Sequence, residues 1–351
     1  MRNRPNGAEH VVPRRRVLST IAAVAGVSAL GIPTTDSHNP PVWRWRGRAL
    51  GAKASLGLCD PDKSRARRSI NLCLAEIERL EQIFSLHRPD SEVARLNRDG
   101  VVDAPSHDLV ALLSEARSFT DQSRGAFDVT VQPLWQLYQS HFAPPNAPPG
   151  GPSRRALDNA VTLVGSEYLD ISPNCIRLGR RDMALTMNGI AQGAITDRIS
   201  DMLGDVGYES VLVELGEIRV AGAPGARPWR IGLDEGSKVV PVSMTNSAVA
   251  TSAGHGTQFE SSGRFHHLFD PATGASAHSC RAVSVFARRA AVADALSTAI
   301  AITGRDRATD LLAALGGDSA RLVFNDGRVE WNGQMGTSIT RRRAIAPVGI
   351  G

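Results

Sequence analysis

Residues 293–299 read Ala-Asp-Ala-Leu-Ser-Thr-Ala and lie in a small, apolar segment that ends at Gly304. The spacing predicts a helix on which Asp294 and Thr298 point the same way. A carboxylate and a hydroxyl in such surroundings need a polar partner. Mg²⁺ suits this role, because it binds few protein oxygens and leaves positions for substrate phosphates. The structural alternative is that Thr298 bonds back to the Asp294 carbonyl, while the helix dipole favours Asp294 near the helix start.

The rest of the chain mixes helical and strand patterns without regular alternation. Apolar residues at helical spacing predict further helices, at residues 70–84, 106–119, 192–203 and 308–315. Short apolar runs predict strands, at residues 161–164, 176–178, 183–187, 210–214, 229–233, 248–251, 282–286 and 321–324. Five prolines make residues 143–152 a surface loop. The predicted fold is therefore α+β, a single compact domain of mixed sheets and helices.

The amino terminus has the pattern of an export signal. Arg14, Arg15 and Arg16 precede an apolar run that is too short to span a bilayer and ends in small residues at 27–29. Adjacent arginines before Val-Leu are typical of the twin-arginine signal. We therefore predict a signal peptide at 1–29, a linker at 30–42, the folded domain at 43–335 and a tail at 336–351, with the protein exported to the periplasm. A basic arm for nucleic acid is the alternative, which the apolar run disfavours.

Charge and cysteine content restrict the class of protein. Residues 1–29 hold five arginines and one glutamate, so the rest of the chain has a net charge near +1 although the whole is +5. A nearly neutral domain gives no reason to expect a nucleic-acid partner. No later stretch is long and apolar enough for a transmembrane helix. The four cysteines show neither CxxC nor zinc spacing, and Cys73 falls on the apolar face of a predicted helix.

Several motifs are individually weak, but their order along the chain is specific. They include residues 84–97 (FSLHRPDSEVARLN), 125–134 (GAFDVTVQPL), 189–197 (GIAQGAITD), 250–254 (ATSAG), 267–274 (HLFDPATG) and 293–299 (ADALSTA). The glycine-spaced loop entering a helix at 189–193 suits a phosphate group, although it is neither a Walker loop nor a GxGxxG motif. In this order, the six motifs resemble the ApbE family of FAD:protein FMN transferases. The loop spelling at 188–193, the reduced turn at 215–219 and the export signal resemble the exported NosX-like members that serve nitrous-oxide respiration.

The resemblance implies an ApbE-like (T-fold-like) architecture and assigns roles residue by residue. Asp294 and Thr298, with Ser297 close by and the backbone carbonyl of Gly189, would bind Mg²⁺ against the FAD pyrophosphate. The flavin pocket would be lined by a further set of residues. This set comprises Leu50, His87, Ala126, Phe127, Asp128, Thr186, Gln192 and His267. The implied reaction is attack by a Ser or Thr hydroxyl of an acceptor protein on the FMN-side phosphorus of FAD, with release of AMP.

The hydroxyl proton requires a base, for which His267 and Asp270 are candidates alongside a catalytic role for Asp294. For the His266-His267 pair the alternative is a solvated strand end with one hydrogen-bonding core histidine. The chain departs from the usual family residues at positions 87, 186, 192 and 194, and the usual Gly-Gly-Asp/Glu is reduced to Gly216-Glu217. The acceptor is expected to be a flavoprotein, a membrane-bound electron-transfer component. Two alternatives stay open: an exported FAD carrier without transferase activity, and a metal-dependent FAD pyrophosphatase.

Overall fold

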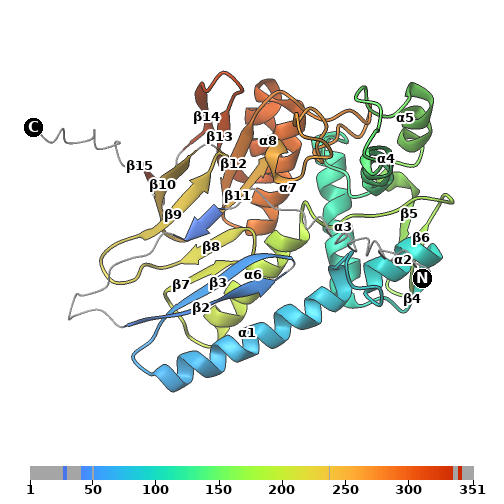
Figure 1. Cartoon of the computed structure of the whole chain (residues 1–351). Helices are drawn as coiled ribbons and strands as arrows, with labels where there is room; N and C mark the ends of the chain where they lie inside the picture. Colours follow the sequence, from blue (N-terminus) through green and yellow to red (C-terminus); the bar gives the residue numbers. More distant parts are fainter. Residues whose placement is uncertain (1–26, 30–40, 50, 237, 335–338, 342–351) are drawn as a thin grey trace, which may run out of the picture.

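An eight-stranded antiparallel sheet crosses the protein in the computed structural model, which describes residues 27–29, 41–49, 51–236, 238–334 and 339–341 (Figure 1). Its strands, in spatial order, are β14 (Val329–Gly333), β13 (Gly317–Val323), β12 (Ala282–Ala287), β11 (Ser247–Ala253), β8 (Ile218–Ala221), β7 (Val211–Glu214), β3 (Ala52–Cys59) and β2 (Val42–Ala49). The central strands β11 and β12 are buried along nearly their whole length because both faces of the sheet are covered.

Helices cover one face of this sheet and enclose the main core. The helices of this layer are α1 (Lys63–Phe84), α3 (His107–Ser123), α6 (Ala191–Asp205), α7 (Ala290–Thr303) and α8 (Ala308–Leu315). Helix α7 packs on β11 and β12, and α6 packs beside it on β7 and β8. Apart from Asp294, Ser297, Thr298 and Thr303, helix α7 carries apolar side chains on all sides, as expected for a helix buried between a sheet and other helices. The two central helices and the strand ends beneath them position the site described below.

A smaller sheet covers the opposite face. It consists of β1 (Val27–Ala29), β9 (Trp229–Asp234), β10 (Val239–Met244) and β15 (Ile339–Arg341), in the spatial order β1-β9-β10-β15. Trp229 and Met244 from this sheet and Phe286 from β12 belong to one buried cluster. The large sheet is therefore a middle layer with apolar side chains on both faces.

The remaining elements flank the helical layer (Figure 1). A three-stranded sheet is formed by β4 (Val101–Asp103), β6 (Cys175–Leu178) and β5 (Leu169–Ile171), next to α2 (Glu92–Asp99). Helices α4 (Gln132–Phe142) and α5 (Arg154–Val161) share an aromatic cluster with the loop at residues 259–269. Short 3₁₀ turns occur at Ser166–Tyr168, Gly254–Gly256 and Arg305–Arg307.

The predicted α+β class and the five predicted helices are confirmed, whereas two of the predicted strands are wrong. Residues 161–164 continue from the end of α5 into a turn, in which the N–H groups of Leu163 and Val164 bond to carbonyls of the preceding helix. Residues 183–187 have no regular secondary structure and join no sheet. There the Asn97 side chain bonds both backbone groups of Leu185, and Thr186 N–H bonds to a loop carbonyl, so no neighbouring strand is required.

Some predicted segments fall partly or wholly outside the described residues. Leu50 lies outside them, as do most of the predicted signal peptide and of the linker. Residues 27–29 of the predicted signal pair with β9, and residues 339–341 of the predicted tail pair with β10. The four cysteines are free, and Cys73 is buried as predicted. Among the described residues, no helix combines the length and the apolar character that a membrane span requires.

Candidate active site

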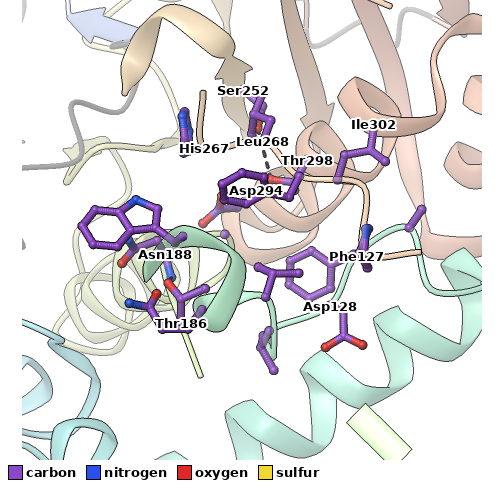
Figure 2. Close-up of a pocket in the computed structure, with 18 of the residues that line it drawn as sticks. Phe127, Asp128, Thr186, Asn188, Ser252, His267, Leu268, Asp294, Thr298 and Ile302 are labelled. Carbon is purple, nitrogen blue, oxygen red and sulfur yellow. Dashed lines mark hydrogen bonds between the residues drawn. The ribbon is translucent and has the colours of Figure 1, made fainter. Parts of the chain in front are cut away.

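A pocket opens where α7, the start of α4 and the end of β11 meet the loop that leads into α6, the turn before β8 and the loops at residues 126–131 and 267–271 (Figure 2). Its walls combine aromatic side chains with a few inward-facing polar groups, which is the usual composition of a ligand site. The lining residues used below are Ala126, Phe127, Asp128, Trp135, Thr186, Gly189, Glu217, Ser252, His267, Phe269, Asp294 and Thr298.

The carboxylate of Asp294 lies at the base of the pocket and is only 4% exposed. One of its oxygens accepts a hydrogen bond of 3.1 Å from the backbone N–H of Gly193, in the first turn of α6. The positive end of the α6 dipole therefore faces this carboxylate. Burial raises the pKa of Asp294 to about 8, although the hydrogen bond from the Gly193 N–H acts in the opposite direction. Without a cation the ionised form of Asp294 is thus unfavourable.

Close contact between α6 and α7 gives Asp294 this position. A Cβ on Gly193 would lie 2.5 Å from the Ala290 carbonyl oxygen and 2.6 Å from the Cα of Ala291, so only glycine permits the approach. Asp197, one turn further along α6, accepts the backbone N–H groups of Ala290 and Ala291 at 2.8 and 3.0 Å. Asp197 thereby caps the start of α7, whose own N-cap residue supplies no side-chain bond.

Three hydroxyl groups lie beside Asp294. Ser252 Oγ on β11 is 2.7 Å from Ser297 Oγ and 3.2 Å from Thr298 Oγ1, the latter shown dashed in Figure 2. It is Ser297, and not Thr298, that bonds back to the Asp294 carbonyl, at 2.9 Å. Thr298 therefore faces the pocket. The Gly189 loop passes close by, because a Cβ on Gly189 would lie 3.5 Å from Thr298 Oγ1.

Glu217 adds a second buried carboxylate to the same pocket and is 2% exposed. Burial and the nearby Asp294 raise the pKa of Glu217 well above the ordinary value, and a hydrogen bond from the Thr251 backbone lowers it only in part. Its second oxygen, Oε2, has no hydrogen-bond partner among the described residues. Two carboxylates and several hydroxyls thus face one cavity, a set of oxygens that suits a hard divalent cation.

His267 lies half-buried in the pocket wall. Its Nδ1 is 3.2 Å from the Thr257 carbonyl oxygen, so we assign the proton to Nδ1 and the free lone pair to Nε2. Burial lowers the pKa of His267 to about 4, which keeps the ring neutral at pH 7. The adjacent His266 is buried in the core, and its Nδ1 accepts the Leu268 N–H at 3.4 Å.

Two further aspartates hold loops in place. Asp128 Oδ1 accepts bonds from the N–H and hydroxyl of Thr130, and Oδ2 accepts the N–H of Ser166. It points away from Asp294 in Figure 2. Asp270 accepts the Ala272 N–H and the Thr273 hydroxyl at 2.9 Å each. Both carboxylates are already occupied by local partners, so the structure gives them turn-forming roles.

Comparisons with known proteins agree with this geometry. The sequence model of the ApbE family matches residues 50–322. This chain belongs to the ApbE family. The FAD:protein FMN transferase of Treponema pallidum is 31% identical over 283 residues, which cover 72% of this chain and 76% of that protein. The corresponding protein of Vibrio cholerae is 30% identical over 242 residues, which cover 66% and 72% respectively.

Solved ApbE structures share the fold. The apo crystal structure of the flavinyl transferase ApbE from Pseudomonas stutzeri matches with a TM-score of 0.71 at 25% identity, covering 85% of this chain and 96% of that one. The ApbE protein of Thermotoga maritima matches with a TM-score of 0.72 at 26% identity, covering 83% and 97%. The family resemblance and the ApbE-like architecture predicted from the sequence are therefore confirmed.

The structure gathers most of the residues that the ApbE resemblance selected. Those lining the pocket are Ala126, Phe127, Asp128, Thr186, Gly189, His267, Asp294 and Thr298. Ser297 is buried directly behind them, and Gln192 is buried against Gly216. His87 is exposed and, like Asp270, lies outside the lining of this pocket.

The predicted set omits several lining residues, among them Glu217, Ser252 and Trp135. Glu217 stands in the shortened Gly216-Glu217 turn, and Ser252 in the ATSAG motif. Glu217 and Ser252 therefore both lie within segments that had already been named from the sequence. Only the tertiary fold, however, shows that both side chains approach Asp294.

Proposed function

We propose that this chain catalyses Mg²⁺-dependent transfer of FMN from FAD to a Ser or Thr hydroxyl of an acceptor protein, with release of AMP. The observation that carries the proposal is the buried pair Asp294 and Glu217, which faces a pocket with aromatic walls and lacks a basic partner in any described ion pair. Membership of the ApbE family and the names of the curated relatives support the same reaction.

The residues present fit a magnesium ion. Glu217 Oε2 is a buried acceptor without a donor, and Asp294 carries a raised pKa, so both gain from a cation. Asp294, Thr298 and the backbone of Gly189 would hold it. When bound at this site, Mg²⁺ would neutralise negative charge on a pyrophosphate.

FAD fits the pocket as a substrate. The half-buried ring of Trp135 provides aromatic surface of the kind on which a flavin or adenine ring stacks, and the buried rings of Phe127 and Phe269 add apolar wall around it. Trp135 is itself fixed by Phe259, whose ring lies edge-on to it at 6.0 Å between centroids. The start of α6, with its backbone N–H groups, lies beside the Gly189 loop and favours negative charge there.

His267 is the base in this proposal. The acceptor hydroxyl oxygen forms a bond to the FMN-side phosphorus, and the bond from that phosphorus to the bridging oxygen breaks. AMP leaves with the bridging oxygen, and the hydroxyl proton passes to His267 Nε2. The Thr257 carbonyl holds the ring through Nδ1 and so keeps Nε2 free to accept the proton. The low pKa of His267, about 4, ensures that this nitrogen is unprotonated before reaction.

Export and the acceptor belong to the same proposal. The tandem arginines at 14–16 and the following apolar run support a periplasmic location. The exported, NosX-like features of the sequence favour an acceptor in a membrane-bound electron-transfer component, such as a flavoprotein of nitrous-oxide respiration.

The test incubates the protein with FAD, Mg²⁺ and a candidate acceptor domain, followed by in-gel flavin fluorescence and AMP assay. The expected result is a fluorescent acceptor band and one AMP per flavin, both absent for an acceptor whose target hydroxyl is removed. His267→Gln should slow transfer roughly 10²–10⁴-fold, the usual contribution of a general base, with FAD affinity retained. Free FMN with AMP would instead identify a pyrophosphatase, and FAD binding without AMP would identify a carrier.

A further inference from the structure

Glu217 occupies a tight turn between β7 and β8. Its carbonyl accepts the N–H of Leu215 at 3.0 Å, and Gly216 between them has a φ of +103°. Glycine adopts this conformation without strain, and a side chain there would collide with Gln192. The turn directs Glu217 inward, where it lines the pocket together with Asp294.

The hydrogen bonding of Glu217 is incomplete. One carboxylate oxygen takes the backbone N–H of Thr251, and Oε2 has no partner among the described residues. Leaving a buried acceptor in this state is unfavourable. Glu235, by contrast, is buried to the same degree at 1% exposure but forms an ion pair with Arg321. Glu217 has no such partner within the part of the chain that is described.

The neighbours of Glu217 are oxygen donors for a cation. Asp294 contributes one carboxylate besides that of Glu217, and Ser252 and Thr298 contribute hydroxyls in the same cavity. Two carboxylates match the charge of one divalent ion, whereas the set Asp294, Thr298 and a backbone carbonyl provides only one negative charge. A second negative charge strengthens the attraction for the cation most before the substrate pyrophosphate adds its own negative charge.

We propose that Glu217 supplies the second carboxylate of the cation site, so that the pocket binds a divalent cation before FAD arrives. This inference rests on the proposed function for the identity of the ion and of the substrate. Its physical basis is separate: an unpartnered, buried carboxylate oxygen beside a second buried carboxylate.

The test is calorimetric titration of MgCl₂ into the full-length protein without FAD, repeated with Mn²⁺ and detected by electron paramagnetic resonance. We expect one ion per chain for the wild type and at least tenfold weaker binding for Glu217→Gln. The Gln carbonyl can keep the Thr251 bond, so the fold should persist, which a melting curve verifies. Glu217→Asp retains the charge on a shorter side chain, so its cation affinity should lie between those of the wild type and Glu217→Gln.

Glu235→Gln is the matched control, because it removes an equally buried carboxylate outside this pocket. Its cation affinity should equal that of the wild type. The inference is overturned if the wild type binds no cation without FAD, or if folded Glu217→Gln binds it as tightly. Cation binding without flavin transfer would refute the proposed function alone, whereas transfer by a wild type that binds cation only with FAD would refute this inference alone.

Discussion

Replacing Asp294 with Asn should stabilise the cation-free protein while removing its response to Mg²⁺. Asn keeps an oxygen for the Gly193 N–H but has no charge to desolvate. Burial holds the pKa of Asp294 at about 8 instead of 3.8, so at pH 7 the folded protein must take up a proton that the unfolded chain does not hold. At 1.36 kcal/mol per pKa unit, this cost has a ceiling of about 4 kcal/mol.

The observed gain should be smaller than the ceiling, because Asp294 shares its surroundings with Glu217 and relaxation lowers the cost. We expect about 1–3 kcal/mol, the range in which uncharged replacements of buried charges stabilise proteins. For a domain of about 300 residues that corresponds to a rise in Tm of roughly 2–5 °C. The assay is thermal melting at pH 7 with and without Mg²⁺, alongside flavin transfer, which Asp294→Asn should abolish.

Glu235→Gln is the control for this prediction as well. It removes one partner of a buried ion pair with Arg321, so its Tm should fall. A fall in the Tm of Asp294→Asn, or an unchanged response of that variant to Mg²⁺, would show instead that Asp294 is a structural residue.

Three further predictions concern pH dependence, the contact between α6 and α7, and export. The raised pKa of Asp294 contributes stability that is fully present below about pH 4 and is lost as pH rises through about 8. The cation-free Tm should therefore fall between about pH 5 and 8 and level off above that, and Asp294→Asn or saturating Mg²⁺ should flatten the fall. Gly193→Ala should lower the free energy of unfolding, measured by chemical denaturation, by about 3 kcal/mol, because the new Cβ meets the backbone of α7. A Cβ at Gly204, on the same helix, meets nothing within 4 Å, so Gly204→Ala should leave that free energy unchanged or raise it. Equal effects of the two substitutions would show that the contact between α6 and α7 does not require glycine at position 193. Replacing Arg14 and Arg15 with Lys should retain the protein in the cytoplasm on cell fractionation, and normal periplasmic levels would exclude the twin-arginine signal.

Helix α7, which carries the proposed cation ligands, was predictable because its pattern is local. Small apolar residues around Asp294 and Thr298, with Gly304 behind them, set both the helix and the shared direction of the two side chains. The glycine loop at 189–193 was predictable for a similar reason. Sequence reasoning did not indicate why Gly193 must be glycine, since the obstacle is the backbone of a helix about a hundred residues away.

Local pattern failed where tertiary contacts decide the structure. Residues 161–164 and 183–187 are apolar runs of strand length, yet turn bonds and the Asn97 side chain satisfy their backbones instead of a sheet. Glu217 was missed because a shortened turn carries no sign of the depth to which its side chain is buried. Asp128 and Asp270 have carboxylates of the right type, but only the fold shows that their oxygens are used by neighbouring turns.

The most direct test of the central claim is mass spectrometry of an acceptor domain after incubation with this protein and FAD, in Mg²⁺ and in chelator. The prediction is a covalent FMN adduct on one Ser or Thr, matched by an equal amount of AMP, present only with Mg²⁺ and the wild-type protein and absent with Asp294→Asn. An unmodified acceptor that the T. pallidum relative modifies under the same conditions, or an adduct formed equally well by Asp294→Asn, would contradict the account.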